Sequence, residues 1–440
     1  MKIPICDYVN QYAASEPLRL HMPGHKGRGP LGVEELDITE VSGADSLYEA
    51  DGIIRESEQN ASALFGCPTF YSTEGSSQCI RAMVLLAMQW AQRQGRVPRI
   101  AAARNVHKAF LTAAAMLDAD VVWLYGAQQD GYLSCRLTAP ALEEAFKKDA
   151  LTAVYITSPD YLGNVADVAA LAAVCHAHNA LLLVDNAHGA YLRFLGQHPM
   201  ELGADLCCDS AHKTLPVLTG GAYLHTSAAL AAGAKEAMAL FGSTSPSYLI
   251  LQSLDACNAY LENYGEKLCA FLPAVEELRQ ALTAHGYVLY GCEPLKLTLL
   301  AKAYGYTGTE LAALLAEKGI VCEFADPDYL VLMLTCETGK DGVERLKNAL
   351  LSIPTGPSVL SAPPRFHACA QVCSIRRAML SAGRKVPVEE AAGCVLASPS
   401  VGCPPAVPIV VCGERIDEKA VEAFRYYGIS HCYIVEDPAI

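Results

Sequence analysis

The sequence predicts an α/β fold whose main sheet is mostly parallel, and two patterns indicate it. Short apolar runs, at residues 99–103, 151–156 and 180–184, alternate with longer stretches of helical periodicity. Polar residues that can do chemistry follow several of these runs, at the carboxyl ends where open α/β sheets bind ligands. Because strands that alternate with helices pair in parallel through right-handed crossovers, we expect a ligand site along that edge of the sheet.

Length, composition and charge limit the number of domains and the classes of partner that we expect. The chain has 440 residues, 52% of them hydrophobic, which is enough for two or three domains with sizeable cores. A formal charge of −14 argues against nucleic acid as a partner and favours cationic small molecules. The first residues lack the apolar core of a signal peptide, and no run of eighteen or more apolar residues predicts a membrane span. We therefore expect a cytoplasmic protein.

The cysteines and histidines predict no metal site. Eighteen cysteines without regular spacing indicate reduced thiols packed as small hydrophobic side chains. Cys175, His176 and His178 cluster in the sequence, but on a helix predicted over 168–178 their side chains fan around the axis. No C-x-x-C pair is present to complete a zinc site.

The start of the chain predicts a helix over 54–65 and then a loop that suits an anion. Residues 70–78 contain Gly75, Ser76 and Ser77, and a helix with its apolar face at positions 80–88 follows. Small hydroxylated residues and a glycine at a helix start leave backbone N–H groups and the positive dipole end facing outward. A phosphate dianion would fit there, although Ser76 or Ser77 is equally an ordinary helix cap.

Two residues later in the chain point to covalent chemistry. Lys213 follows His212 in the short polar turn 210–216, and partial desolvation would favour the neutral, nucleophilic amine. Asp185 ends the apolar run 180–184, which reads as a buried strand of a parallel sheet. Pyridoxal phosphate needs this pair, since a lysine carries its aldehyde carbon as a Schiff base and an acid keeps its ring nitrogen protonated.

Around these two residues the sequence resembles the ornithine/lysine/arginine decarboxylases. Residues 183–190 and 209–215 are similar to the family's signatures, and 23–28 and 36–40 extend the likeness. The resemblance implies a fold-type-I large domain with a mostly parallel seven-stranded sheet, a smaller α/β domain and a C-terminal α+β domain. It also implies a short form, without the N-terminal receiver-like domain of longer bacterial members. We place an N-terminal segment at 1–45, the large domain at 46–248, the small domain at 249–352 and the C-terminal domain at 358–440.

The resemblance also assigns residues to the cofactor. His107 follows the strand 99–103 and matches the R-N-x-H-K histidine that stacks on the pyridoxal ring, while a lone histidine is otherwise most often structural. Ala187 is small enough for the ring to lie against its backbone, and His188 matches the histidine beside the cofactor. The implied phosphate contacts are Gly75, Ser76, Ser77, Ser210 and His212, and the implied catalytic residues are Lys213, Asp185 and His107.

The second half predicts a smaller domain and shows departures from the family. We expect one helix over 249–284, strand-like stretches at 295–299, 319–323 and 330–334, and a helix around 310–315. Glu323 and Asp326 resemble the family's E-x-x-D near the substrate, and residues 243–248 match a stretch that helps build the partner subunit's site. The departures are Asn186, where the family usually has an acid, Tyr191, where it often has histidine, Gly220, where it has glutamine, and Ala406 and Cys412 near the C-terminus.

Together these observations predict a homodimeric decarboxylase with active sites at the subunit interface. It would convert lysine, ornithine or arginine to CO2 and an amine of polyamine metabolism, and the sequence leaves all three substrates open. An aminotransferase or a β-eliminating lyase would share Lys213 and Asp185, so these residues do not discriminate among pyridoxal-phosphate enzymes. A regulatory paralogue without cofactor is a further alternative, which the presence of the lysine, acid, histidine and phosphate loop disfavours.

Overall fold

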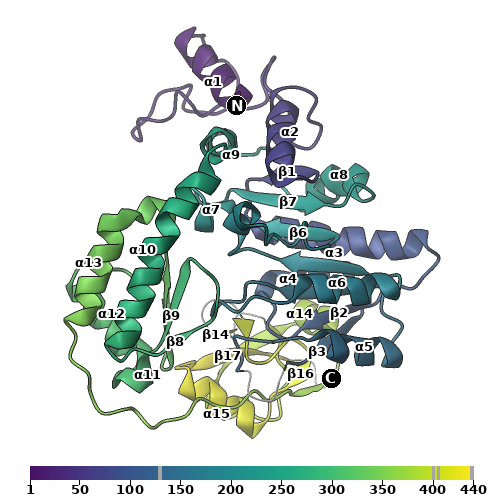
Figure 1. Ribbon diagram of the computed structural model, residues 1–440. Helices are drawn as coiled ribbons and strands as arrows, with labels where there is room; N and C mark the ends of the chain where they lie inside the picture. Colours follow the sequence, from purple (N-terminus) through teal and green to yellow (C-terminus); the bar gives the residue numbers. More distant parts are fainter. Residues whose placement is uncertain (127–130, 399–401, 404–406, 437–440) are drawn as a thin grey trace. The chain divides into compact units, whose positions relative to one another are not determined.

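The computed structural model describes residues 1–126, 131–398, 402–403 and 407–436, and within them the chain forms two compact units. Unit 1 consists of residues 1–97 and 175–267, and unit 2 of residues 98–174 and 268–440 (Figure 1). This division differs from the three predicted domains, whose boundaries stay a prediction. In the described part of the chain, no helix combines the length and apolarity needed to cross a membrane.

Four strands form the sheet of unit 1, and their pairing decides which loops come together. Antiparallel β7 lies between β1 and β6, and β5 pairs with β6 in parallel. Ser72 pairs with Ala222, and Tyr223 pairs with Asp209. The carboxyl ends of β1, β6 and β5 therefore meet at one edge. In sheet order the strands are β1 (Thr69–Ser72), β7 (Ala222–Thr226), β6 (Leu206–Asp209) and β5 (Leu181–Asp185).

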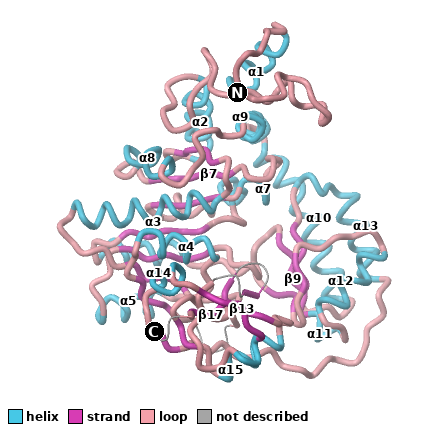
Figure 2. The backbone as a smooth tube through the Cα atoms, turned by 180° about the vertical axis from the view of Figure 1, so that it is seen from behind, coloured by secondary structure: helices cyan, strands magenta, loops and turns pink. Residues whose placement is uncertain are grey.

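The long helix α3 (Ser76–Arg93) covers this sheet by packing on all four strands, as Figure 2 shows from behind. Its buried residues Met83, Leu86 and Ala87 recur at the helical period, so one apolar face meets the sheet. Helices α1, α2 and α9 pack on one another (Figure 1). The shorter helices of unit 1 are α1 (Pro4–Ala14), α2 (Ile53–Phe65), η1 (Ala190–Leu195), α7 (Ala211–Thr214), η2 (Ala231–Gly233), α8 (Ala234–Ala239) and α9 (Tyr248–Leu261).

The start of α2, which confirms the helix predicted over 54–65, is held by a residue far from its first turn. Asp45 is buried, and its Oδ2 accepts hydrogen bonds from the backbone N–H groups of Gly52, Ile54 and Arg55 at 2.8, 3.0 and 3.4 Å. Helix starts leave such N–H groups unpaired, so Asp45 does the work of an N-cap. Asp45 thus has a structural role.

Unit 2 contains the other three strands of the predicted seven. They are parallel, and β2 lies between β4 and β3. Helix α4 packs against α14. The helix predicted over 168–178 is confirmed as α6. These elements are β2 (Ile100–Ala103), α4 (Lys108–Leu117), β3 (Val121–Leu124), α5 (Ala139–Lys148), β4 (Ala153–Thr157), α6 (Val168–Ala177) and α14 (Ile375–Leu380).

A second, antiparallel sheet of unit 2 has the order β10, β11, β9, β8 and packs against α11 and α12. Its elements are α10 (Tyr264–Ala284), β8 (Leu289–Tyr290), β9 (Lys296–Leu300), α11 (Ala301–Tyr304), α12 (Gly308–Glu317), β10 (Phe324–Ala325), β11 (Tyr329–Met333), η3 (Cys336–Thr338) and α13 (Gly339–Leu351). These elements lie within residues 249–352, for which the smaller α/β domain is predicted.

The C-terminal part of unit 2 is built from three short strand pairs around a core that includes Phe424 and Ile434. Its elements are β12 (Ala370–Gln371), β13 (Gly383–Pro387), η4 (Val388–Glu390), β14 (Gly402–Cys403), β15 (Val407–Pro408), β16 (Glu414–Arg415), α15 (Glu418–Tyr426) and β17 (His431–Val435). Cys412 is completely buried, whereas the departure at Ala406 lies outside the described residues.

Two predicted elements are wrong in detail. The single helix over 249–284 is two helices, because α9 ends at Leu261 and α10 begins at Tyr264, after Asn263, a residue type that favours helix starts. The stretch 319–323 is not a strand. Val321 is 91% exposed, and pairing with β11 begins only where Phe324 turns into the core opposite Val331.

The departure at Gly220 follows from the backbone. Gly220 has a φ of +102°, and its carbonyl accepts a 2.7 Å hydrogen bond from the N–H of Gly75. A Cβ at Gly220 would lie 3.0 Å from the carbonyl oxygen of Thr73 and 3.1 Å from a side-chain carbon of Ile250. The glutamine usual in the family cannot occupy this conformation without strain.

We expect Gly220→Gln to lower the free energy of unfolding by about 2 kcal/mol, because a non-glycine residue is forced into the left-handed region. Urea denaturation of the purified variant measures this. Gly265→Gln is the matched control, since a Cβ there meets no atom within 4 Å and glutamine is a better helix former than glycine. Equal destabilisation by both variants would contradict the explanation.

Candidate active site

At the shared carboxyl edge of β5 and β6, the structure brings Lys213 next to His188. The Lys213 Nζ and the His188 Nε2 lie 3.0 Å apart. Lys213 stands on α7, the single helical turn that follows β6, and His188 follows β5 and is buried. Because β5 and β6 run in parallel, the two residues that follow them reach the same place.

Asp185 occupies the last position of β5 and is almost completely buried. Its Oδ1 accepts hydrogen bonds from the backbone N–H of Ala187 at 3.2 Å and from the Cys208 thiol at 3.6 Å. Asp185 and Cys208 are register partners across β5 and β6. The acid is thus fixed on the strand next to the one that leads into Lys213, and Ala187 lies buried beside it.

The predicted phosphate loop meets the lysine segment through two hydroxyl groups. The Ser210 hydroxyl donates a 2.8 Å hydrogen bond to the Ser76 hydroxyl. Ser76 is the first residue of α3, and Gly75 before it has a φ of +72° and provides no side-chain cap. The eighteen-residue helix therefore starts beside these hydroxyls without a side-chain cap, with Ser77 in the same first turn, so its positive dipole end is open to an anion.

The hydrogen bonding of His212 limits how this residue could contact a phosphate. Its Nδ1 donates to the carbonyl oxygen of Gly221 at 2.9 Å, so this nitrogen carries a proton. Burial and, more weakly, the neighbouring Lys213 lower the pKa of His212. A phosphate contact through the other nitrogen, Nε2, requires a second proton on the ring, and a nearby dianion favours its uptake.

This edge of unit 1 fits pyridoxal phosphate. It gathers one amine, one buried carboxylate and a helix start lined with hydroxyls, which are the groups that this cofactor needs for its aldehyde, its ring nitrogen and its phosphate. The loop has room for the anion, because a Cβ at Gly75 would meet only one atom, 4.0 Å away. Of the predicted cofactor residues, all but His107 belong to unit 1.

His107 lies in unit 2, where it caps helix α4. Its Nδ1 accepts a 3.1 Å hydrogen bond from the backbone N–H of Ala109, which fixes the ring orientation. A neutral His107 therefore carries its proton on Nε2. The stacking role of this ring stays a prediction.

Sequence reasoning missed the role of Arg104 in unit 2. Its guanidinium donates to the carbonyl oxygens of Pro408 and Ile409 at 3.0 and 3.1 Å and pairs with the buried Glu414 at 3.2 Å. Burial raises the pKa of Glu414, and Arg104 opposes that rise. Arg104 thus attaches the C-terminal part of unit 2 to the strand end before His107.

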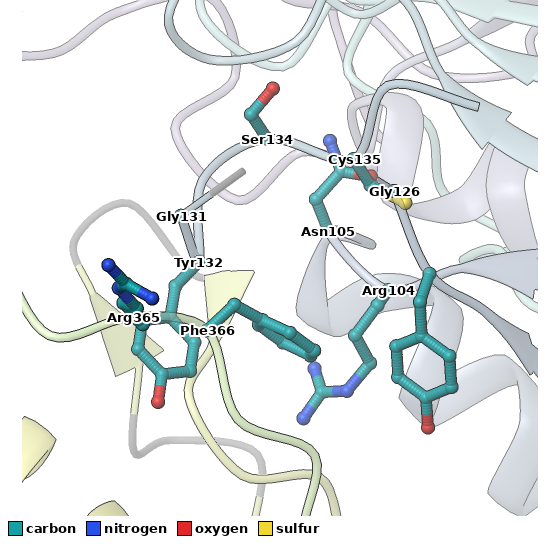
Figure 3. A pocket seen from close by; sticks show the side chains of 10 residues that line it. Arg104, Asn105, Gly126, Gly131, Tyr132, Ser134, Cys135, Arg365 and Phe366 are labelled. Atoms are coloured by element: carbon teal, nitrogen blue, oxygen red, sulfur yellow. The ribbon is translucent and has the colours of Figure 1, made fainter. Parts of the chain in front are cut away.

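A cavity of about 320 Å³ lies beside Arg104 (Figure 3). Asn105 and Phe366 line it, and Arg365 stands exposed at its side. With Arg104 and Arg365 among its lining residues, this cavity does not suit the cationic side chain of a basic amino acid.

The acidic residues of the E-x-x-D stretch differ in their surroundings. Glu323 is exposed and accepts a 2.7 Å hydrogen bond from the hydroxyl of Tyr161. Asp326 is buried, and its Oδ1 accepts from the N–H groups of Asp328 and Tyr329 at 2.7 and 2.6 Å. The Oδ2 of Asp326 has no hydrogen-bond partner among the described residues. Burial raises the pKa of Asp326 to about 6.

Two groups of side chains among the described residues bring possible metal ligands within 4.8 Å of one another. One is His198, Cys207 and Asp209 in unit 1, and the other is His367, Cys369 and Asp417 in unit 2. Neither includes the Cys175, His176 and His178 cluster of the sequence.

Solved structures with the same architecture define the fold class. The Escherichia coli constitutive lysine decarboxylase is similar with a TM-score of 0.77 and 16% identity, over 99% of this chain and 82% of that one. Lysine decarboxylase A from Pseudomonas aeruginosa gives a TM-score of 0.79 at 17% identity, over 98% and 80%. A NifS-like protein gives 0.56 over 79% of this chain. The fold is that of fold-type-I pyridoxal-phosphate enzymes, and the α/β prediction is confirmed.

The family follows from the sequence itself. Residues 3–291 match the major domain of the Orn/Lys/Arg decarboxylases, and the chain belongs to that family. It is a carboxy-lyase whose cofactor is pyridoxal phosphate. Bacillus subtilis protein YaaO, named as uncharacterized, is 30% identical over 96% of this chain and 93% of its own length. Arginine decarboxylase of the same organism is 26% identical over 95% and 92%.

The raised pKa of Asp326 predicts a pH-dependent stability. A folded-state pKa of about 6 against 3.8 in the unfolded chain means that the folded state holds the extra proton between these values. The contribution of protonated Asp326 to the free energy of unfolding is complete below pH 3.8 and is lost as pH rises through 6. It amounts to at most about 3 kcal/mol. Relative to wild type, Asp326→Asn should therefore gain unfolding free energy between pH 4.5 and pH 7.5.

Urea denaturation at the two pH values measures this gain. Asp341→Asn, which changes an exposed aspartate on α13, is the control and should differ from wild type equally at both pH values. An Asp326→Asn variant with the same stability difference at pH 4.5 and pH 7.5 would contradict the raised pKa.

Proposed function

We propose that this chain decarboxylates a basic L-amino acid, namely lysine, ornithine or arginine. The observation that carries the proposal is the convergence of Lys213, Asp185 and the Ser76–Ser210 hydroxyl pair at one sheet edge in a chain of this family. The acidic balance of the chain, −14, adds a weak attraction for a cationic substrate. The relatives named as arginine decarboxylases support arginine as the first substrate to test.

In this proposal each residue of unit 1 has a defined task. Lys213 would hold the cofactor through its side-chain amine. Asp185 keeps the ring nitrogen protonated, because its buried negative charge stabilises a proton there. The N–H groups at the start of α3, with Ser76, Ser77, Ser210 and His212, bind the phosphate.

The bound cofactor supplies an electron sink for the bond that is broken at the substrate Cα. The reaction type would then depend on which substituent of the substrate Cα the protein holds in the position for cleavage. A site that holds the carboxylate there decarboxylates, whereas one that holds the hydrogen there transaminates or eliminates. His188, at 3.0 Å from the Lys213 amine, is placed to exchange a proton with that amine.

A substrate panel tests the proposal. We expect the purified protein to release CO2 from at least one of arginine, lysine and ornithine, and to absorb visible light because a cofactor is joined to Lys213. The measurement is CO2 release and product amine for each amino acid at equal concentration, with added pyridoxal phosphate.

Lys213→Ala is the control for this panel. It should lose both the visible absorbance and CO2 release while keeping its fold by circular dichroism. Amino transfer to pyruvate without CO2 release would favour an aminotransferase instead. A folded wild-type protein that takes up no pyridoxal phosphate would favour the regulatory alternative.

The enzyme is further proposed to be a homodimer with sites at the subunit interface. Residues 243–248 support this, because they resemble a stretch that contributes to the partner's site. In this chain they adjoin the phosphate loop, since the N–H of Ser243 donates to Glu74 Oε1 at 2.5 Å. Light scattering should give twice the chain mass of 47.0 kDa, and a monomer that is fully active would contradict the shared site.

A further inference from the structure

A completely buried carboxylate, that of Asp209, immediately precedes the segment that carries Lys213. Asp209 is the last residue of β6. Its Oδ2 lies 3.1 Å from the Nε2 of His198 and 3.1 Å from the Nε2 of His225, and neither histidine has any exposed surface. Two rings from different segments therefore converge on one oxygen atom.

The protons at this oxygen can be assigned. The backbone N–H of Met200 donates to Nδ1 of His198 at 3.3 Å, so the proton of a neutral His198 is on Nε2 and points at Asp209. Burial alone would raise the pKa of Asp209, but the two histidines outweigh it and hold that pKa below its usual range. An ionised carboxylate only accepts hydrogen bonds, so His225 also donates through Nε2.

The other carboxylate oxygen of Asp209 reaches the neighbouring strand. The side-chain amide of Asn186 donates to Asp209 Oδ1 at 2.6 Å. Asn186 directly follows Asp185, and its amide is completely buried. The chain makes room for this amide at Gly189, where a Cβ would lie 2.0 Å from Asn186 Oδ1. We call Asp209, Asn186, His198 and His225 the Asp209 cluster.

The Asp209 cluster and the candidate active site lie on opposite faces of β6. Side chains alternate along a strand, and Cys208, the residue before Asp209, directs its thiol at Asp185. Asp209 therefore points to the other face, as does Cys207, whose sulfur lies 3.8 Å from Asp209 Oδ1. The cluster can therefore influence the cofactor residues through the backbone that carries them.

We propose that Asp209 is a positioning residue, which fixes the turn of Lys213 and the strand end of Asp185 relative to each other. This rests on the proposed function, in which the amine and the acid bind one cofactor. The carboxylate of Asp209 accepts a hydrogen bond from Asn186, the residue that follows Asp185. Asp209 also ends β6, four residues before Lys213. A buried polar network of this kind, in which both oxygens of Asp209 accept hydrogen bonds, holds one backbone arrangement, as a precise site requires.

The obvious different interpretation is a metal site, because His198, Cys207 and Asp209 could all be ligands. Their atoms are already engaged with one another as hydrogen-bond donors and acceptors at 3.1 and 3.8 Å. Metal analysis of the purified holoenzyme separates the two. One equivalent of a transition metal per chain, lost on His198→Gln, would overturn the positioning role.

The first test compares two substitutions of one histidine. His225→Leu removes the donor to Asp209, whereas His225→Gln keeps an N–H at the position of Nε2. In the holoenzyme we expect kcat to fall about tenfold or more in His225→Leu with little change in KM, since displacement of reacting groups by a fraction of an ångström has effects of this size. His225→Gln should retain kcat within about threefold.

A matched control lies at the other end of the same strand. The Nε2 of His176 contacts Asp205 Oδ2 at the same 3.1 Å, but Asp205 precedes β6, at the opposite end of the strand from the Lys213 turn, and His176 is exposed. His176→Leu should leave kcat unchanged. If His225→Leu folds with reduced thermal stability but has wild-type kcat, or if it behaves as His225→Gln does, the cluster is merely structural and the inference fails.

The second test uses the residue usual in the family. Asn186→Asp would put a second carboxylate 2.6 Å from Asp209 Oδ1, and two carboxylates at this distance cannot both ionise. The folded state must keep a proton between them, so the variant is closest to wild type at low pH. We expect cofactor content per chain, and the thermal midpoint of the apoprotein, to fall relative to wild type as pH rises from 5.5 to 8.5.

Wild type measured alongside keeps the two proposals apart. A wild type without visible absorbance or CO2 release contradicts the proposed function. A wild type that has both, beside an Asn186→Asp variant whose cofactor content and apoprotein stability follow the wild-type pH profile, contradicts the positioning role alone.

Discussion

The antiparallel pairing of β7 between β1 and β6 is the constraint on which the candidate active site depends. It pairs Ser72 with Ala222 and Asp209 with Tyr223, so the phosphate loop, the lysine turn and the acid's strand end leave the sheet at one edge. A shift of one residue in this register would turn every side chain of a strand to the opposite face. The strand pairing therefore decides which side chains can face the candidate active site.

Buried carboxylates hold the loops that leave the sheet. Asp45 collects the N–H groups at the start of α2, Asp209 collects side-chain donors from three segments, and Glu414 receives Arg104 in unit 2. Each has its burial compensated by several donors, without which an isolated buried charge would be strongly unfavourable. The hydrogen bonds to these carboxylates thereby fix the positions of the segments that supply the donors.

The residues of the candidate active site and those of the Asp209 cluster lie on opposite faces of β6. On β6, Cys208 faces Asp185 and the candidate active site, whereas Cys207 and Asp209 face the supporting cluster. Alternation along a strand thus lets adjacent residues serve different tasks. Gly220 also supports the site from the backbone. Its left-handed conformation allows its carbonyl oxygen to accept a hydrogen bond from the N–H of Gly75 in the phosphate loop.

By itself the sequence determined the α/β class, most element positions and the family, because apolar periodicity and short motifs such as the one around Lys213 are local signals. It could not show that Ser210 meets Ser76, or that His198 and His225 share one oxygen of Asp209. Those contacts join segments far apart in the chain, and no periodicity marks them. Only the tertiary structure decided them, because strand order and register select which distant residues become neighbours.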